Sequence, residues 1–322
     1  MLTFARGELT YSKIQKSTLL HQRTMADYDS AGFILSMVSI PFFVIGFLGN
    51  VLVIRIVHKT PEMHSVTNYL LANLAVSDGL TIFFLWPFML LETIKFSKKF
   101  DCALMALKGL IVPVSSLTLM VLAIERYHAL LKPFRTGLRL KKENVKRAIA
   151  IIWISSVLNS LPIAIMELKG NEVVHWCLPS SKVLFFVWTG VVVYIPVAVF
   201  LYCYGSLIKG LYFDKTICAS SGDRQEDRAC EKKKLVITFM LATAGFLVGY
   251  GPSVTFYTLV VIGATQEIYS SVLSPVIIFT FLCSLCLNPV LYAFRSTNFR
   301  QGFKRIIFCR DPQTQNEMLQ QP

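Results

Sequence analysis

Ionisable side chains inside long apolar runs are the groups in this 322-residue chain that could do chemistry. Asp78 and Lys108 each lie within such a run, and Glu125 and Arg126 stand together at the end of another. A charge inside an apolar segment is costly, so it usually marks a place where an ion, a ligand or a second charge is bound. A buried carboxylate can bind a cation or accept hydrogen bonds, and a buried ammonium group can bind a carboxylate.

The sequence lacks the motifs of enzyme active sites. It has no Gly-rich phosphate loop and no His-Glu-x-x-His motif, and its five histidines lie mainly in tails and loops. The single Cys-x-x-Cys stretch, Cys283 to Cys286, has no second ligand pair and is attributed to packing. We therefore expect no catalytic residues and no enzyme activity.

Seven apolar runs of about 20 residues position the ionisable groups, and each is long enough to cross a bilayer as a helix. The chain is 54% hydrophobic and only 16% charged, whereas about 25% charge is usual in soluble domains. Strands of a membrane barrel would alternate in polarity, and these runs do not. The sequence predicts an all-α membrane protein, a seven-transmembrane helix bundle with a short amphipathic eighth helix. The spans cover residues 32–57, 68–91, 103–124, 145–166, 183–204, 235–262 and 268–294.

These spans divide the chain into an N-terminal tail (1–30), the bundle (31–296), and an amphipathic helix with a tail (297–322). The N-terminal tail lacks the apolar core of a signal peptide, so the first span is expected to act as the insertion signal. Residues 214–231 mix both charge signs with Ser and Gly, and we expect a mobile loop there.

Basic residues indicate the orientation. About two thirds of the 32 Lys and Arg residues follow spans one, three, five and seven. Because short cytoplasmic loops carry the basic excess, the N-terminus is expected to be extracellular. The net charge of +13 is then a topology signal, and since no soluble basic face interleaved with aromatics is present, we expect no nucleic-acid binding. A multi-pass protein of the plasma membrane is predicted.

One short motif lies within each span or directly at its end. In chain order the motifs are Gly49-Asn50-Val51, Leu71 to Asp78, Glu125-Arg126-Tyr127, Trp153, Pro196, Phe246 with Pro252, and Asn288-Pro289-Val290-Leu291-Tyr292. Together they resemble the motifs of the rhodopsin-like (class A) G-protein-coupled receptors, over essentially the whole chain after residue 30. The resemblance implies a cell-surface receptor that binds an extracellular ligand and activates heterotrimeric G proteins.

The resemblance implies a role in G-protein coupling for Glu125, Arg126, Tyr127, Tyr204 and Tyr292. In the family, the arginine pairs with the neighbouring acid in the inactive state and extends towards the G protein in the active state, while the last two tyrosines help to hold the open state. The alternative is an arginine that only snorkels to the membrane surface. Some relatives lock this arginine to an acid in span six, but Lys232 occupies that position here, so this lock is expected to be absent.

A sodium site is also implied by the resemblance. Its members would be Asn50, Asp78, Ser115, Ser284 and Asn288. The alternative is a buried, partly protonated Asp78 that only links neighbouring helices. No other cofactor is implied.

The residues implied in an activation switch are Phe246, Tyr250, Pro252, Asn288 and Pro289. Tyr250 stands where the family usually has Trp, with a glycine on each side. Pro252 removes a backbone hydrogen bond and favours a kink in span six. The alternative for Tyr250 is a packing aromatic with no switching role.

Three further features concern cysteines and a proline. Cys102 and Cys177 match the disulfide of the family on the oxidising side of the membrane. Cys309 follows a basic amphipathic stretch like the membrane-surface helix of the family, which implies lipid contact and palmitoylation. Pro113 interrupts span three, so we expect the top of that helix to be turned or unwound.

The ligand class is inferred from what stands in the outer half of the bundle. Amine receptors of the family have an Asp where this chain has Lys108, and residues 268–294 contain no Lys for a retinal Schiff base. A short loop after span five and an acidic outer surface resemble neuropeptide receptors, so a peptide ligand is expected. Its predicted contacts are Lys108, Glu92, Glu172 and Trp176. Alternatively, Glu92 and Lys108 form a structural ion pair.

Other functions compete with that of a peptide receptor. A chemosensory, small-metabolite or lipid receptor of the same fold stays open. A seven-span channel or transporter would show a polar stripe or paired broken helices, which are not seen. Arrestin is a further implied partner, but Thr314 alone offers a hydroxyl for phosphorylation after Cys309, so we expect weak engagement. The other candidates for phosphorylation are Ser220, Ser221, Ser296 and Thr297.

Overall fold

The computed structural model describes residues 34–35, 37–91, 98–132, 139–168, 182–210, 223–264 and 268–307, and these are almost entirely helical. The first helix is Met37–Lys59. The other long helices are α2 (Val66–Leu91), α3 (Lys98–Leu131), α4 (Val145–Leu168), α7 (Asp223–Ile262) and α8 (Ile268–Arg295). Between α4 and α7, one continuous helix consists of α5 (Lys182–Thr189), the π-helical turn η4 (Gly190–Tyr194) and α6 (Ile195–Ile208). The short turns η1 (Pro61–Met63) and η3 (Lys142–Asn144) precede α2 and α4, and α9 (Thr297–Ile307) ends the described chain.

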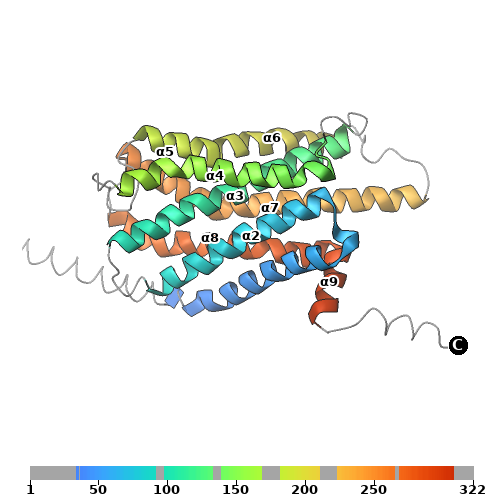
Figure 1. The fold of residues 1–322 in the computed structure, drawn as a ribbon, viewed down its shortest axis with the longest axis horizontal. Coiled ribbons are helices and arrows are strands. Elements are labelled where there is room, and N and C mark those ends of the chain that lie inside the picture. Colours follow the sequence, from blue (N-terminus) through green and yellow to red (C-terminus); the bar gives the residue numbers. More distant parts are fainter. Residues whose placement is uncertain are drawn as a thin grey trace, which may run out of the picture.

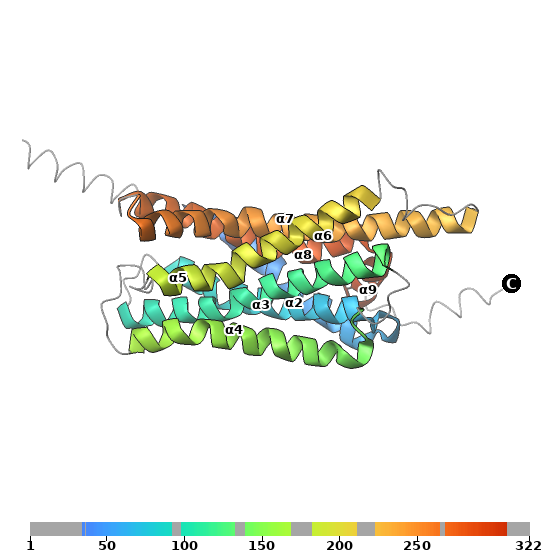
Figure 2. The ribbon, with the colours of Figure 1, turned by 90° about the horizontal axis from the view of Figure 1, so that it is seen from above.

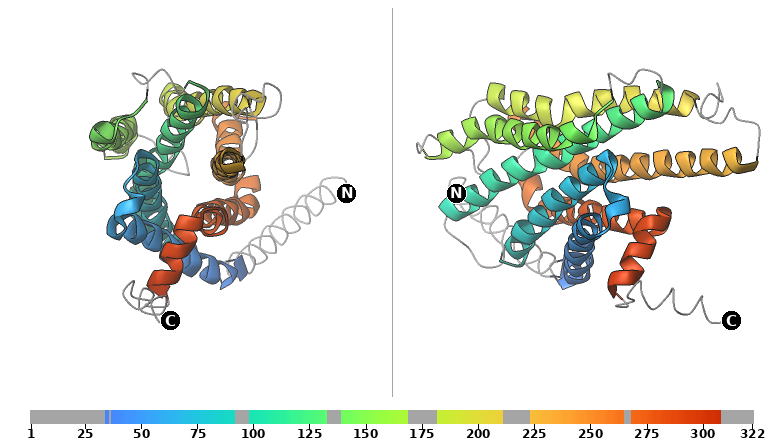
Figure 3. Two further views of the ribbon diagram at one scale, coloured as in Figure 1. Left: turned by 90° about the vertical axis from the view of Figure 1, so that its right-hand side faces the viewer. Right: turned by 45° about the vertical axis from the view of Figure 1, so that its right-hand side comes forward.

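The long helices lie side by side along the long axis of the molecule (Figure 1). From above, α4 lies on one side next to α3, and α7 lies on the other side (Figure 2). Seen end-on, the helices form a ring whose end is crossed by α9 (Figure 3, left). Within this ring α3 contacts α2, α4, α6 and α7. The predicted all-α bundle of seven long helices with a short additional helix is confirmed over the described residues.

The polarity of the bundle is the reverse of that of a soluble protein. Large apolar side chains point outward, such as Leu201 (72% exposed) and Val248 (71%), whereas Asp78 and Asn50 are buried. In water the outward positions would be mainly polar. By length and composition, four of the described helices can each cross a membrane, and α8 carries a shorter apolar stretch, Phe279–Phe294. Helices suit a bilayer because they satisfy their own backbone groups.

Contrary to the expectation from sequence, Pro113 does not unwind the top of α3, which is one continuous helix from Lys98 to Leu131. A proline cannot donate a hydrogen bond to the carbonyl four residues earlier, which here belongs to Gly109. Ser160 of α4 replaces the missing donor, because its hydroxyl donates to the Gly109 carbonyl over 2.5 Å. The neighbouring helix thus keeps α3 intact.

Pro196 at the start of α6 is compensated in the same way. The carbonyl that it leaves free belongs to Val192, inside the π-helical turn η4. Ser116 of α3 donates its hydroxyl to this carbonyl over 2.5 Å. A buried serine of α3 therefore fixes the position of η4 against the centre of the bundle.

The predicted span six, residues 235–262, agrees with the membrane-crossing part of α7, Val236–Ile262, but the helix itself extends about three turns further at its start. The helix α7 begins at Asp223 and not near residue 235, so residues 223–231 of the expected loop are helical. Residues 223–231 include two Arg, two Glu, one Gln and one Ala, which favour helix, and their six charged side chains lower the hydropathy. A hydropathy criterion detects the membrane-crossing part of a helix and misses its polar extension.

Candidate functional site

A hydrogen-bonded polar cluster lies in the apolar centre of the bundle. Oδ1 of Asp78 accepts a hydrogen bond from the Ser115 hydroxyl (2.9 Å), and Oδ2 accepts one from Nδ2 of Asn288 (2.6 Å). The oxygens of Ser77 and Ser115 are 2.9 Å apart. Because these residues belong to α2, α3 and α8, the carboxyl group of Asp78 joins three helices.

Asn50 of the first helix adds a second link to α8. Its Nδ2 donates to the Gly46 carbonyl (2.9 Å) and to the Leu285 carbonyl (3.4 Å). Leu285 is four residues before Pro289, so Asn50 bonds the carbonyl that this proline leaves free. Oδ1 of Asn50 and Oδ1 of Asn288 are buried and have no hydrogen-bond partner among the described residues. Buried polar atoms are normally paired, so these two oxygens are candidates for binding a cation or water.

Ser284 does not bond Asp78 but donates its hydroxyl to the Phe281 carbonyl of its own helix (2.7 Å). Of the predicted sodium residues, the structure thus joins Asp78, Ser115 and Asn288 directly. Carboxylate, hydroxyl and carboxamide oxygens are the ligands that hard cations prefer. Asp78 supplies the carboxylate in these hydrogen bonds, and the other two groups, Ser115 and Asn288, are neutral.

Arg126, near the end of α3, is held by neighbours on three sides. Its Nη2 is 3.1 Å from Oε2 of Glu125 and donates to the hydroxyl of Thr67 on α2. The guanidinium carbon is 5.4 Å from the centroid of the Phe239 ring on α7. The Nε atom is buried without a hydrogen-bond partner among the described residues, so part of the donor capacity of the guanidinium is unused.

The tyrosines expected beside Arg126 are buried, and one of them links α6 to α7. The oxygens of the Tyr204 and Thr243 hydroxyls are 3.0 Å apart, and the Tyr204 hydroxyl also donates to the Phe239 carbonyl (3.4 Å). The Tyr292 hydroxyl is buried without a partner in the described chain, and its ring lies 5.5 Å from that of Phe299 in α9. Tyr127 instead faces away towards α6, where its hydroxyl oxygen is 3.2 Å from that of Tyr202.

An aromatic row connects Lys108 to α7. Nζ of Lys108 is 5.4 Å from the centroid of Phe281, and this ring is 5.5 Å from that of Tyr250. Tyr250 stacks in turn on Phe246, again with centroids 5.5 Å apart. The rings of all three aromatic residues are buried, so the row passes through the core from α3 by way of α8 to α7.

Close packing at Gly249 fixes this row. A Cβ atom at Gly249 would lie 2.3 Å from Oγ of Ser284 and 3.2 Å from the Thr280 carbonyl oxygen. At Gly251 a Cβ atom would meet no atom within 4 Å. Of the two glycines that flank Tyr250, only the first is needed for the approach of α7 to α8.

Several predicted residues lie outside the part of the chain that the structure describes. They are Glu92, Glu172, Trp176, Cys177 and Cys309, together with the side chains of Cys102 and Lys232. The predicted disulfide, the palmitoylation site and the Glu92–Lys108 ion pair therefore stay predictions. The side chain of Pro252 is exposed, on the outer face of α7.

The sequence analysis did not predict two residues of the site, Phe281 and Thr67. Phe281 stands among many apolar residues of span seven, and the available signal was its position seven residues before Asn288, on the same face of the helix. Thr67 precedes span two and has no recognisable signal. Its contact with Arg126 depends on how α2 packs on α3.

Comparison with known proteins agrees with this architecture. Residues 49–292 match the model of the family described as 7 transmembrane receptor (rhodopsin family). The chain is 28% identical to somatostatin receptor type 4 of Rattus norvegicus, covering 83% of this chain and 70% of that protein. It is 27% identical to neuropeptide FF receptor 2 of Mus musculus, with 88% and 73% covered. It is 24% identical to the pyroglutamylated RF-amide peptide receptor of Mus musculus, with 83% and 68% covered. The fold is also that of squid rhodopsin, with a TM-score of 0.72 at 17% identity over 88% of this chain and 89% of that chain.

Proposed function

Because this chain belongs to the rhodopsin family of seven-transmembrane receptors, we propose that it binds an extracellular peptide and activates heterotrimeric G proteins. It is a multi-pass protein of the plasma membrane, and we place its N-terminus outside the cell on the distribution of basic residues. A peptide ligand is supported by relatives named as receptors for somatostatin, neuropeptide FF and RF-amide peptides.

The observation that best supports coupling to a G protein is the setting of Arg126. This cation lies near one end of the bundle, between Glu125 and Thr67 and against the ring of Phe239 on α7. A displacement of α7 removes Phe239 and frees the guanidinium, which can then donate to a carbonyl or carboxylate of a partner protein. In this proposal α7 is the moving element and Arg126 is the group that it uncovers.

The row from Lys108 to Phe246 supplies a route by which a ligand can move α7. A ligand group that draws Lys108 away from Phe281 releases that ring from one side, and Phe281 packs directly on Tyr250. Packed side chains transmit such shifts because the core has discrete arrangements rather than a continuous range. We place the peptide at Lys108, where its carboxylate or a backbone carbonyl accepts from the ammonium group, and assign Glu92, Glu172 and Trp176 to the surrounding pocket.

A sodium ion in the polar cluster is the second part of the proposal. Asp78 would supply charge, and the unpartnered Oδ1 atoms of Asn50 and Asn288 would supply neutral oxygen ligands. The ion neutralises the carboxylate in the low-dielectric core, and it stabilises whichever arrangement of α8 keeps Asn288 at Asp78.

Agonist-stimulated nucleotide exchange on purified G proteins tests the main proposal. Somatostatin, neuropeptide FF and an RF-amide peptide are the first ligands to try, followed by a peptide library. Arg126→Ala should abolish stimulated exchange while leaving ligand affinity nearly unchanged. Arg147→Ala is the matched control, since Arg147 is an exposed arginine on α4. Full stimulation by a normally expressed Arg126→Ala protein would refute the coupling role.

Lys108 is tested separately through ligand affinity. Lys108→Glu should weaken binding by about 2–5 kcal/mol if the ammonium group contacts the ligand directly. Lys182→Glu, at the exposed start of α5, is the control. If adding Glu92→Lys to Lys108→Glu restores affinity, the two residues form a structural pair, and unchanged potency of Lys108→Ala would place the ligand elsewhere.

A further inference from the structure

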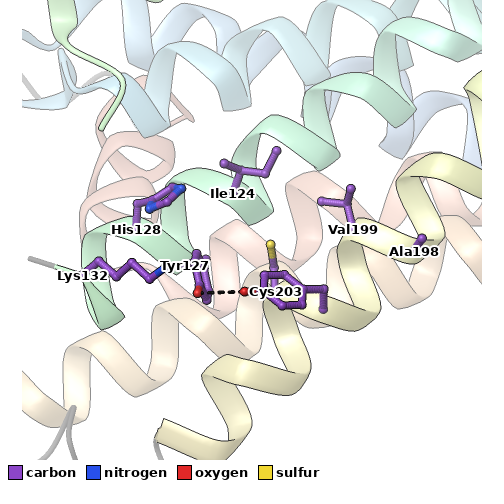
Figure 4. A pocket seen from close by; sticks show the side chains of 8 residues that line it. Ile124, Tyr127, His128, Lys132, Ala198, Val199 and Cys203 are labelled. Atoms are coloured by element: carbon purple, nitrogen blue, oxygen red, sulfur yellow. Dashed lines mark hydrogen bonds between the residues drawn. The ribbon is translucent and has the colours of Figure 1, made fainter. Parts of the chain in front are cut away.

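A groove on the outside of the bundle, between α3 and α6, shares only Tyr127 with the coupling residues described above. Its cavity volume is about 450 Å³. The lining residues are Ile124, Tyr127, His128, Lys132, Ala198, Val199, Tyr202 and Cys203 (Figure 4). Along α3 the groove extends from Ile124 to Lys132, roughly 12 Å at the rise of an α-helix.

The groove opens towards the lipid. Tyr202 is 62% exposed, and the adjacent Leu201 is 72% exposed on the same strongly apolar helix. The wall away from Lys132 consists of Ala198, Val199 and Ile124, with no polar side-chain atom. A membrane places hydrocarbon against such a surface, so the occupant of this wall is apolar and belongs to the bilayer.

The other end of the groove is cationic and polar. His128 and Lys132 lie there together, away from Ala198 and Val199 (Figure 4). Nζ of Lys132 is 4.9 Å from the centroid of the Tyr127 ring, and within the described residues no carboxylate lies at ion-pair distance from it. Nδ1 of His128 is buried and has no hydrogen-bond partner in the described chain. A positive charge and a buried nitrogen without a partner thus adjoin an apolar wall.

Lys132 directly follows the last residue of α3, and its backbone N–H still bonds the His128 carbonyl (3.2 Å). This places the ammonium group at the end of a membrane-crossing helix, the depth at which lipid head groups begin. The arrangement has the polarity of a phospholipid, with an apolar tail and a charged head at the membrane surface.

We propose that the groove binds one anionic phospholipid of the cytoplasmic leaflet. One acyl chain lies along Ala198, Val199 and Ile124, and the phosphate accepts a hydrogen bond from Nζ of Lys132. An anionic head group is favoured over a zwitterionic one because no described carboxylate pairs with Lys132 and the anionic lipids of that leaflet attract basic residues. Since the lipid would bridge α3 and α6, it would stabilise the contact through which Tyr127 meets Tyr202.

A sterol is the competing occupant, because the spacing of Leu122, Tyr127 and Lys132 fits a weak pattern proposed for cholesterol. A sterol offers one hydroxyl and no charge. It would add no negative charge beside the ammonium group of Lys132, so the charge of the groove favours the phospholipid.

Lipid binding can be measured by native mass spectrometry of the full receptor in detergent, titrated with phosphatidylserine, phosphatidylcholine or cholesterol. Lys132→Gln should weaken binding of phosphatidylserine about fivefold, the effect of about one lysine charge at a membrane surface. Lys59→Gln, an exposed lysine ending the first helix, is the charge control. Ala198→Trp fills the apolar end of the groove, and Ala244→Trp adds the same bulk at an exposed alanine of α7.

The proposal requires tighter binding of phosphatidylserine than of phosphatidylcholine, with a loss in both Lys132→Gln and Ala198→Trp and in neither control. Equal loss in Lys59→Gln would show general charge attraction, and full binding by Ala198→Trp would show that the groove is not used. Either result overturns the proposal. Displacement of phosphatidylserine by cholesterol from the unaltered receptor would identify a sterol site and overturn it as well. Thermal unfolding of each variant checks the fold, and Ala198→Trp tests the groove even if Lys132→Gln does not fold.

Discussion

Replacing Ser160 with alanine should destabilise the bundle, because it leaves one backbone carbonyl of α3 without a hydrogen bond. This carbonyl belongs to Gly109. Pro113 has no N–H to donate to it, and the Ser160 hydroxyl donates instead, over 2.5 Å. Ser160 is buried, so water has little access to the vacated position. The neighbouring helix α4 is therefore predicted to supply a hydrogen bond to α3 that a backbone N–H supplies in most helices.

Two general values bound the free energy of unfolding that Ser160→Ala should cost. Leaving a buried acceptor unpaired costs about 1–3 kcal/mol in proteins generally. Hydrogen bonds between membrane helices average only about 0.6 kcal/mol, with a maximum near 1.7. For a carbonyl with no backbone donor we expect about 1 kcal/mol. In a Pro113→Ala background, the new N–H of residue 113 can donate to Gly109, so Ser160→Ala should cost almost nothing there.

A double-mutant cycle tests this reasoning. Four proteins are compared by their free energy of unfolding in mixed micelles: the unaltered receptor, Ser160→Ala, Pro113→Ala and the double variant. The cycle removes the separate effect of losing the proline ring, and the coupling energy should be about 1 kcal/mol. Because Lys108 precedes Gly109, Ser160→Ala should also lower agonist potency. Equal cost of Ser160→Ala in both backgrounds would refute the role of the proline.

Three further predictions concern the core. Asp78→Asn should abolish the effect of sodium on agonist affinity, measured by radioligand competition, and unchanged sodium sensitivity would contradict the ion site. Tyr250→Phe should keep agonist-stimulated nucleotide exchange because the ring contacts remain, whereas Tyr250→Ala should lose it. Equal loss in both variants would place the function in the hydroxyl group. Gly249→Ala should destabilise the bundle by about 1–3 kcal/mol in thermal unfolding, because its Cβ meets Ser284. Gly251→Ala, with open space at its Cβ, should be neutral or slightly stabilising, and equal effects of the two glycine variants would argue against close packing at residue 249.

The fold was largely predictable because a bilayer imposes one requirement on every span. A run of about 20 apolar residues has to be helical, since no water is present to bond its backbone. Prediction failed where the determining contact is tertiary or lies outside the bilayer. Pro113 signals disruption in any single-sequence analysis, and only the position of Ser160 on another helix explains why α3 continues. The start of α7 at Asp223 lies beyond the apolar region to which hydropathy responds.

The polar cluster was easier to predict than the aromatic row. Asp78, Ser115 and Asn288 stand out because polar groups in apolar spans need partners, and the structure joins them. Phe281 is one of 24 phenylalanines, and aromatic residues in a membrane span are ordinary packing residues. Its importance comes from lying between Lys108 and Tyr250, which is a property of three helices together.

The polar cluster and the aromatic row meet at the contact between α7 and α8. The Phe281 carbonyl accepts from Ser284, and Ser284 lies against Gly249, the neighbour of Tyr250. One turn further along α8, Asn288 bonds Asp78. A ligand that shifts Phe281 therefore displaces the same stretch of α8 that a cation would hold at Asp78. If sodium lowers agonist affinity by some factor, linkage requires the agonist to lower sodium affinity by the same factor, and we expect the segment from Phe281 to Asn288 to carry that coupling.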